Sequence, residues 1–194
     1  LNEEEENSYE IIKWEVEIGK ELLEQPTNLV PLHQFWGTHL TMAQFAGGTS
    51  AQPFKTEKDY NNFLSRMEKY AVWIDSAMVY MKKGIDKGVV LPRALTVKLI
   101  PQFADMATDS IQDNLFYSAI KVMPASFPDS MKKDLTEKYS AAIKTKLIPQ
   151  YNKMATFLTK EYLPASRSTS GLGSLPFGKQ LYATYVKQWT TTQM

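Results

Sequence analysis

The chain has 194 residues, of which 43% are hydrophobic and 22% are charged, and its formal net charge is +1. This length and composition are typical of one globular domain or two small ones, and they exclude a disordered tail. The sequence has no cysteine, which excludes disulfide scaffolds, thiolate zinc sites and cysteine nucleophiles. It has only two histidines.

The charge is distributed unevenly along the chain. Residues 1–24 hold nine acids and two lysines, a net charge of −7, whereas the remaining residues carry +8. The bases are spread over the whole remainder, and nucleic-acid binding requires bases clustered on one face, so no nucleic-acid partner is predicted. No apolar run approaches the ~18 to 20 residues of a membrane span, so no transmembrane segment is predicted.

Two segments precede the main periodic region. Residues 1–24 are predicted as an acidic helix whose apolar positions, regular over 8–24, fall on two faces, which indicates packing between two neighbours. Residues 25–55 are rich in Pro, Gly, Gln and aromatic residues. They are predicted as an irregular connection that holds a short helical turn around residues 40–46.

Residues 56–194 are predicted as a helical array. Apolar residues over 57–82 recur at intervals of three, one and three, which places them on one face of a long helix. That face consists of Tyr60, Phe63, Leu64, Met67, Tyr70, Ala71, Ile74, Ala77, Met78 and Met81. Thr56 is the predicted N-cap, with Asp59 three residues later beside the helix N-terminus.

Prolines divide the rest of the array. Pro92 suits the first turn of a second helix, which we expect to kink at Pro101. A long helix starts after Pro128, bends or breaks at Pro149 and stops at Pro164. A last helix begins at about Lys179. Because no strand-like alternation is present, the predicted fold class is all-α: a bundle-like array of about six to eight helices with long, Pro-kinked helices and no significant sheet.

The two histidines, His33 and His39, are six residues apart, a spacing that turns them away from each other on a helix. No acid between Gln25 and Gln52 completes a metal site, so no metal is predicted here. We favour loop histidines bonded to backbone. A role for His39 in lining a substrate cleft remains open.

The segment Gly171–Gly178 resembles a phosphate-binding loop only superficially, since it follows a helix and lacks the Gly-Lys-Ser/Thr ending. Two interpretations stay open for it. Its glycines leave the backbone free of side chains, and the N-terminus of the helix that follows can hold an anion such as a carboxylate. The same features equally suit a tight turn between helices.

Several motifs together resemble a known family. They are residues 31–39 (PLHQFWGTH), 52–60 (QPFKTEKDY), 84–92 (GIDKGVVLP) and 171–182, the last followed by Thr190-Thr-Thr192. Their order and separation resemble the bacterial "domain of unknown function 885" family over nearly the whole chain from about residue 28. The resemblance implies a mostly helical protein similar to zinc metallopeptidases of the gluzincin type.

In that family the zinc motif follows the stretch that corresponds to Thr190-Thr-Thr192. The resemblance therefore implies that residues 1–194 are the N-terminal helical portion of a longer protein, inactive alone, with no catalytic or metal residue and no cofactor of its own. Zinc is expected in the C-terminal part of the same protein, which is then the main partner, with a peptide as substrate. The resemblance also favours the bacterial cell envelope, as a periplasmic protein or a lipoprotein.

Under this interpretation the chain forms the substrate cleft of the peptidase. The substrate-binding candidates are polar side chains beside apolar surface: Tyr182, Lys179, Arg167 and His39. The alternative is a non-enzymatic helical binding or interaction module of the envelope.

Overall fold

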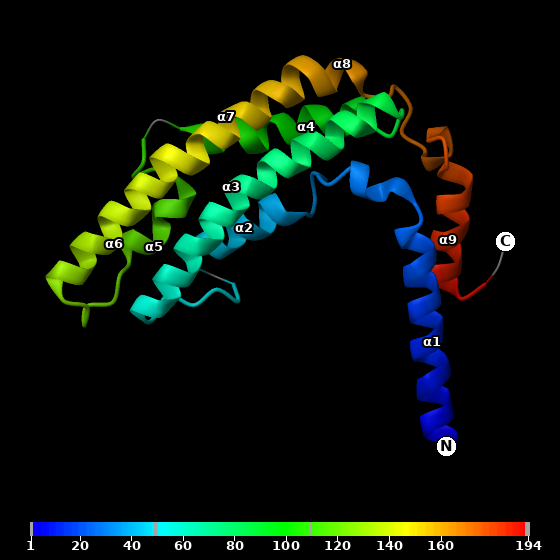
Figure 1. The fold of residues 1–194 in the computed structure, drawn as a ribbon, viewed down its shortest axis with the longest axis horizontal. Helices are drawn as coiled ribbons and strands as arrows, with labels where there is room; N and C mark the ends of the chain where they lie inside the picture. Colours follow the sequence, from blue (N-terminus) through cyan, green and yellow to red (C-terminus); the bar gives the residue numbers. More distant parts are fainter. Residues whose placement is uncertain (1, 49, 109, 193–194) are drawn as a thin grey trace.

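The computed structural model describes residues 2–48, 50–108 and 110–192, and helices dominate them (Figure 1). The α-helices are α1 (Glu3–Leu23), α2 (Thr38–Ala46), α3 (Glu57–Asp86), α4 (Arg93–Ala104), α5 (Ser118–Lys121), α6 (Asp129–Ala142), α7 (Ile148–Phe157), α8 (Leu163–Ala165) and α9 (Gly178–Thr190). Short 3₁₀ turns lie at η1 (Pro26–Leu29), η2 (Asp105–Ala107), η3 (Leu115–Tyr117) and η6 (Leu172–Ser174). Over the described residues there is no sheet, only one isolated bridge between Pro92 and Arg167. The all-α prediction is confirmed.

Helix α3 is the centre of the main body. Thr56 and Asp59 form a reciprocal capping box at its start, as predicted, and this satisfies backbone donors that the first turn leaves unpaired. The predicted apolar face is buried along the whole helix except Leu64, which is half-buried against the core. Burial of this face is the main contribution of α3 to stability.

One long helical rod runs from α6 to α8 beside α3 (Figure 1). It contains two π-helical turns, η4 (Ile143–Leu147) and η5 (Leu158–Tyr162). Each turn ends two residues before a proline, Pro149 or Pro164. The rod passes Pro149 without breaking and ends just after Pro164, so one continuous helix is observed and not a break at Pro149. Helix α4 packs against α7 and closes the core from the other side.

Helices α1 and α9 lie side by side as an arm that projects from one end of the body (Figure 1). α1 begins five residues before the periodic pattern, because Asn2 and Glu5 form a capping box. The ammonium of Lys187 on α9 pairs with Glu21 and lies over the Trp14 ring at 5.1 Å. Among the described residues only one face of α1 is covered, around Ile18.

The opposite face of α1, with Ile12 and Val16, is exposed, so the predicted packing of both faces is not observed. Within the described ranges no helix has both the length and the hydropathy to cross a bilayer.

Candidate functional site

A cavity of about 330 Å³ lies where the arm joins the body. Its walls come from the loop after α3, the start of α4, the loop before α9, the inner side of α9 and the segment around His33. Most of the lining is aliphatic or aromatic, and Thr27, His33, Arg167, Ser170 and Tyr185 add polar groups. This volume lies at the lower end of the ~300 to 1,000 Å³ range of ligand pockets, and the mixture of apolar wall and few polar groups is typical of them.

Two glycines allow the cavity walls to approach so closely. A Cβ on Gly84 would lie 2.6 Å from the Val89 carbonyl oxygen and 2.9 Å from that of Leu29. A Cβ on Gly178 would lie 1.8 Å from the carbonyl oxygen of Leu172. These contacts leave no room for a side chain, so both glycines are required by close packing of backbone on backbone.

A strap of backbone hydrogen bonds joins the two loops of the wall. The N–H of Arg93 donates to the Arg167 carbonyl at 2.8 Å, and the N–H of Arg167 donates to the Leu91 carbonyl at 3.2 Å. The N–H of Leu91 donates to the hydroxyl of Tyr162 at 3.0 Å. Burial raises the pKa of Tyr162 to about 12, so this hydroxyl stays neutral at physiological pH.

The side chain of Arg167 organises the loop that leads to α9. Its Nε donates to the Val90 carbonyl at 3.2 Å, and its Nη1 donates to the carbonyls of Thr169 and Gly171 at 2.7 and 2.8 Å. Partial burial lowers the pKa of Arg167. Of the predicted substrate-binding residues, Arg167 is the one that lines the cavity. The segment Gly171–Gly178 is thus a turn between helices, and the Arg167 guanidinium stabilises it by donating to Gly171 and Ser174.

His39 lies in the core instead of the cavity. Its ring stacks on Phe103 with centroids 5.2 Å apart, and its Nε2 lies 3.1 Å from Oε1 of Gln102. The amide nitrogen of Gln102 donates to the Gln34 carbonyl at 2.9 Å, so the pair fixes the loop before α2 to α4. Burial lowers the pKa of His39. His39 is therefore a neutral, structural histidine at neutral pH.

His33 is the histidine that reaches the cavity. Its Nδ1 accepts a hydrogen bond from the N–H of Phe35 at 3.2 Å, which is the backbone bonding expected for a loop histidine. Its ring stacks on the exposed Trp36, with centroids 4.9 Å apart. The sequence signal that could have selected His33 is its position shortly before Phe35 and Trp36, because its ring contacts both of these aromatic rings.

Comparisons place the chain in a family. Residues 1–194 match the family described as "Bacterial protein of unknown function (DUF885)". The chain belongs to the DUF885 family. The crystal structure of "the putative lipoprotein from Colwellia psychrerythraea" is similar, with a TM-score of 0.74 and 17% identity over 84% of this chain. The chain spans only 28% of that protein. No curated protein sequence matches.

The remaining predicted residues of this DUF885 chain lie outside the cavity lining. Lys179 and Tyr182 are exposed on α9, with Tyr182 52% exposed. Leu181 and Tyr185 of the same helix do line the cavity. Tyr182 follows Leu181 directly and lies about one turn before Tyr185. The cavity and the exposed edge of α9 are therefore neighbouring surfaces.

No zinc ligand set is assembled in the described part of this DUF885 chain. Across 2–48, 50–108 and 110–192, no three His, Asp or Glu side chains form a group that could hold a metal. Nε2 of His39 is engaged with Gln102, and Nδ1 of His33 with the Phe35 N–H. One nitrogen of each imidazole therefore has a partner, while Nδ1 of His39 is buried without one, and no chemical step is assigned to a metal at either histidine.

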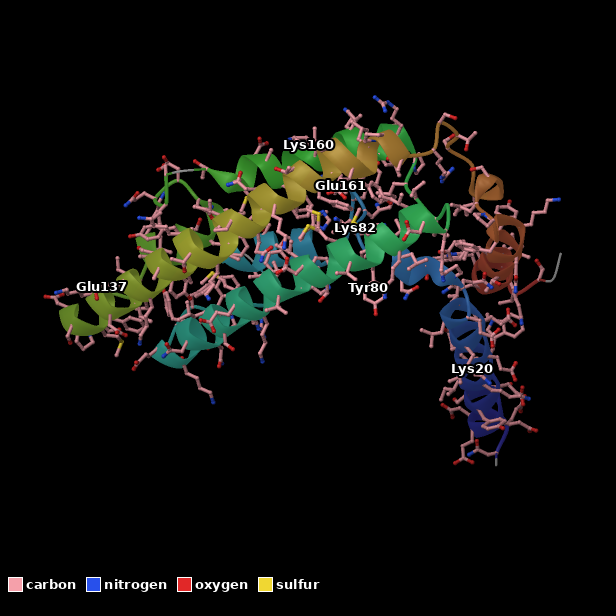
Figure 2. The ribbon with its side chains drawn as sticks, turned by 45° about the horizontal axis from the view of Figure 1, so that its top comes forward. Lys20, Tyr80, Lys82, Glu137, Lys160 and Glu161 are labelled. Atoms are coloured by element: carbon pink, nitrogen blue, oxygen red, sulfur yellow. The ribbon has the colours of Figure 1, made fainter. Side chains whose placement is uncertain are left out.

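A second hollow lies between the C-terminal half of α3 and the residues of α7 and η5. Figure 2 shows Lys82 of α3 and Glu161 of η5 facing each other, and their charged groups are 3.0 Å apart. Asp75 of α3 likewise pairs with Lys153 of α7 and accepts a hydrogen bond from Gln150 at 2.8 Å. The acids of this hollow are paired with neighbouring bases, which favours a structural seam over a binding site.

Proposed function

We propose that this chain forms one wall of the substrate-binding cleft of a zinc-dependent peptidase of the bacterial envelope. The zinc ion and the catalytic groups would belong to other residues of the same protein, which is the partner that this wall faces. The observation that carries the proposal is the apolar cavity at the joint of arm and body, with hydroxyl, imidazole and guanidinium groups among its lining. The motifs shared with the DUF885 family supply the chemical class.

The wall contributes to peptide hydrolysis by positioning the substrate and excluding water. An apolar cavity removes a substrate side chain from water, which anchors the peptide next to the reacting groups. Tyr182 and Lys179 on the exposed edge of α9 are the groups assigned to the peptide backbone. A zinc ion, when bound elsewhere in the protein, supplies Lewis-acid polarisation of the scissile carbonyl.

The proposal is tested with two proteins, the 194-residue chain and the product of the whole gene, each dialysed and then assayed with fluorogenic peptides with and without zinc. We expect the whole product to hydrolyse peptides when it holds zinc and the 194-residue chain to be inactive. A whole-gene product that binds zinc stoichiometrically and leaves every peptide intact would reject the proposal. Activity in the 194-residue chain would reject the assignment of catalysis to other residues.

The assignment of Tyr182 has its own test in the whole-gene product. Tyr182→Phe should lower kcat/KM by about 5- to 150-fold, since one polar contact contributes roughly 1 to 3 kcal/mol. The melting temperature should not change, because the side chain is half exposed. Tyr80→Phe, a second partly exposed tyrosine, on α3 of the body, serves as the matched control.

The second candidate function is a helical binding module of the envelope without hydrolytic activity. The similarity in fold to a protein described as a putative lipoprotein agrees with the envelope location that this candidate requires. The two candidates differ in one outcome: a binding module retains its ligand unchanged, whereas a peptidase releases products.

A further inference from the structure

Arg167 brings an unbalanced positive charge to the cavity. It is the charged residue among the lining side chains, and no carboxylate of the described residues lies within ion-pairing distance of it. The oxygens around it belong to the carbonyls of Val90, Thr169 and Gly171 and the hydroxyl of Ser174. Carbonyl dipoles orient the guanidinium but leave its full charge uncompensated.

One edge of the guanidinium is less engaged than the rest. Nη1 makes three contacts of 2.7 to 2.8 Å, whereas Nη2 has a single contact of 3.4 Å, to the Ser170 carbonyl. Each terminal guanidinium nitrogen carries two N–H donors, so Nη2 retains donor capacity. The nearby start of α9 has no acid in its first turn and no side-chain cap, and Lys179 lies there, so its electrostatic character is also positive.

The rest of the lining suits one bulky apolar group. Leu95 and Pro92 come from the α4 side, Leu172 and Phe177 from the loop before α9, and Leu181 from α9 itself. The lining contains no acid. A cavity of about 330 Å³ has room for a side chain or a short chain and not for a folded partner.

We propose that the cavity binds the C-terminal residue of a peptide, taking its aliphatic or aromatic side chain into the apolar lining and its free carboxylate to Arg167. This inference rests on the proposed function and deepens it, because it names the substrate class as peptides with an apolar C-terminal residue. The carboxylate neutralises the guanidinium, and charge-assisted hydrogen bonds of this kind are stronger than neutral ones. A peptide with a C-terminal amide lacks the charge that pairs with Arg167, and a peptide with a polar C-terminal side chain lacks the group that fits the apolar lining.

The ligand class is tested by calorimetric titration of the 194-residue chain without zinc. The probes are N-acetyl-Ala-Ala-Leu, the same peptide with a C-terminal amide, N-acetyl-Ala-Ala-Asp and decanoate. We expect the leucine acid to bind at least tenfold more tightly than its amide and than the aspartate peptide. Equal affinity for acid and amide overturns the role of the carboxylate. Binding of decanoate at least tenfold tighter than the leucine peptide overturns the peptide assignment in favour of a fatty acid.

The location is tested with paired variants of α4. Leu95→Trp fills the cavity, whereas Val97→Trp places the same side chain two residues away, where Val97 is 48% exposed. We expect the first variant to lose binding of the leucine peptide at least tenfold and the second to keep it, with both melting cooperatively. Retained binding in a folded Leu95→Trp variant overturns the location. Arg167→Gln should remove the preference for acid over amide, and a persisting preference overturns the role of Arg167.

These experiments are independent of hydrolysis. Binding by the 194-residue chain together with an inactive whole-gene product rejects the peptidase and leaves the binding site standing. Hydrolysis by the whole-gene product with no preference for an apolar C-terminal residue leaves the peptidase standing and overturns this assignment.

Discussion

The backbone N–H of Leu91 and the hydroxyl of Tyr162 form a buried hydrogen bond of 3.0 Å between two segments that are 71 residues apart in the chain. Tyr162 ends the second π-helical turn of the long rod, and Leu91 lies in the cavity wall. The bond therefore fixes the wall to the long rod of the body. Stability of the cavity and stability of the rod are linked through it.

Tyr162→Phe removes the acceptor for the Leu91 N–H and leaves that donor buried without a partner. We expect the free energy of unfolding to fall by about 1 to 3 kcal/mol, the cost of an unsatisfied buried group. Urea denaturation followed by circular dichroism measures the change. Tyr80→Phe is the control, because Tyr80 is 41% exposed, and its change should stay within about 0.5 kcal/mol. Equal effects of the two substitutions would contradict the structural role of the bond.

The sequence predicts the elements of the body well where periodicity and caps act together. The α3 face and the capping box of Thr56 and Asp59 are both local patterns, and the structure has both. The arm was less predictable. The start of α1 depends on Asn2 and Glu5, which lie outside the apolar period, and its burial depends on α9, more than 150 residues later.

The prolines of the rod show a second feature that the sequence does not predict, which is how a helix continues past a proline. A proline inside a helix predicts a kink, since it lacks an N–H and its ring meets the carbonyl four residues earlier. Here a π turn before Pro149 accommodates the ring while the rod continues, and a second π turn precedes Pro164, where the rod ends. Helical periodicity alone does not distinguish a π turn from a break, because both shift the apolar face by a fraction of a turn.

The cavity was only partly predictable for a similar reason. The polar tip of Arg167 beside apolar residues is visible in the sequence, but its bonds to four groups of its own loop and to the Val90 carbonyl follow from tertiary packing. His39 was considered on residue type alone, and the structure buries it beside Gln102, 63 residues away. Selecting between His33 and His39 required knowledge of which neighbour each one meets.

The pH dependence of stability should depend on His39. Its pKa in the folded state is lowered by burial, below the ordinary value of about 6.5 that it regains on unfolding. As pH falls below about 6.5 the unfolded chain takes up the proton first, so folding stability decreases with decreasing pH until the folded pKa is reached. His39→Gln should flatten the fall between pH 7.5 and 5.5 in urea denaturation. His33→Gln, which changes a partly exposed histidine, should keep it, and a flattened profile in this control would contradict the assignment.

Gly178→Ala should destabilise the protein by about 1 to 3 kcal/mol, the usual cost of overpacking. The new Cβ would lie 1.8 Å from the Leu172 carbonyl oxygen, so the loop before α9 must move. Thermal unfolding measures the loss. Gly171→Ala is the matched control in the same loop, because nothing lies within 4 Å of its Cβ position. A Gly178→Ala protein as stable as the control would show that the loop is not closely packed in solution.

The exposed face of α1 should make the 194-residue chain associate with itself at high concentration. Tyr9, Ile12 and Val16 are each more than half exposed and lie on one side of the helix, and apolar surface of this kind favours contact with a second copy. The nine acids of residues 1–24 oppose this contact by repulsion, so association should increase as salt screens them. Light scattering at low and high ionic strength measures the effect.

Ile12→Gln should shift the protein toward monomer, whereas Glu15→Gln, which removes one charge and no apolar surface, should favour association. A chain that stays monomeric at all salt and protein concentrations would contradict the role of this face, and weaker association at high salt would indicate ionic contacts instead.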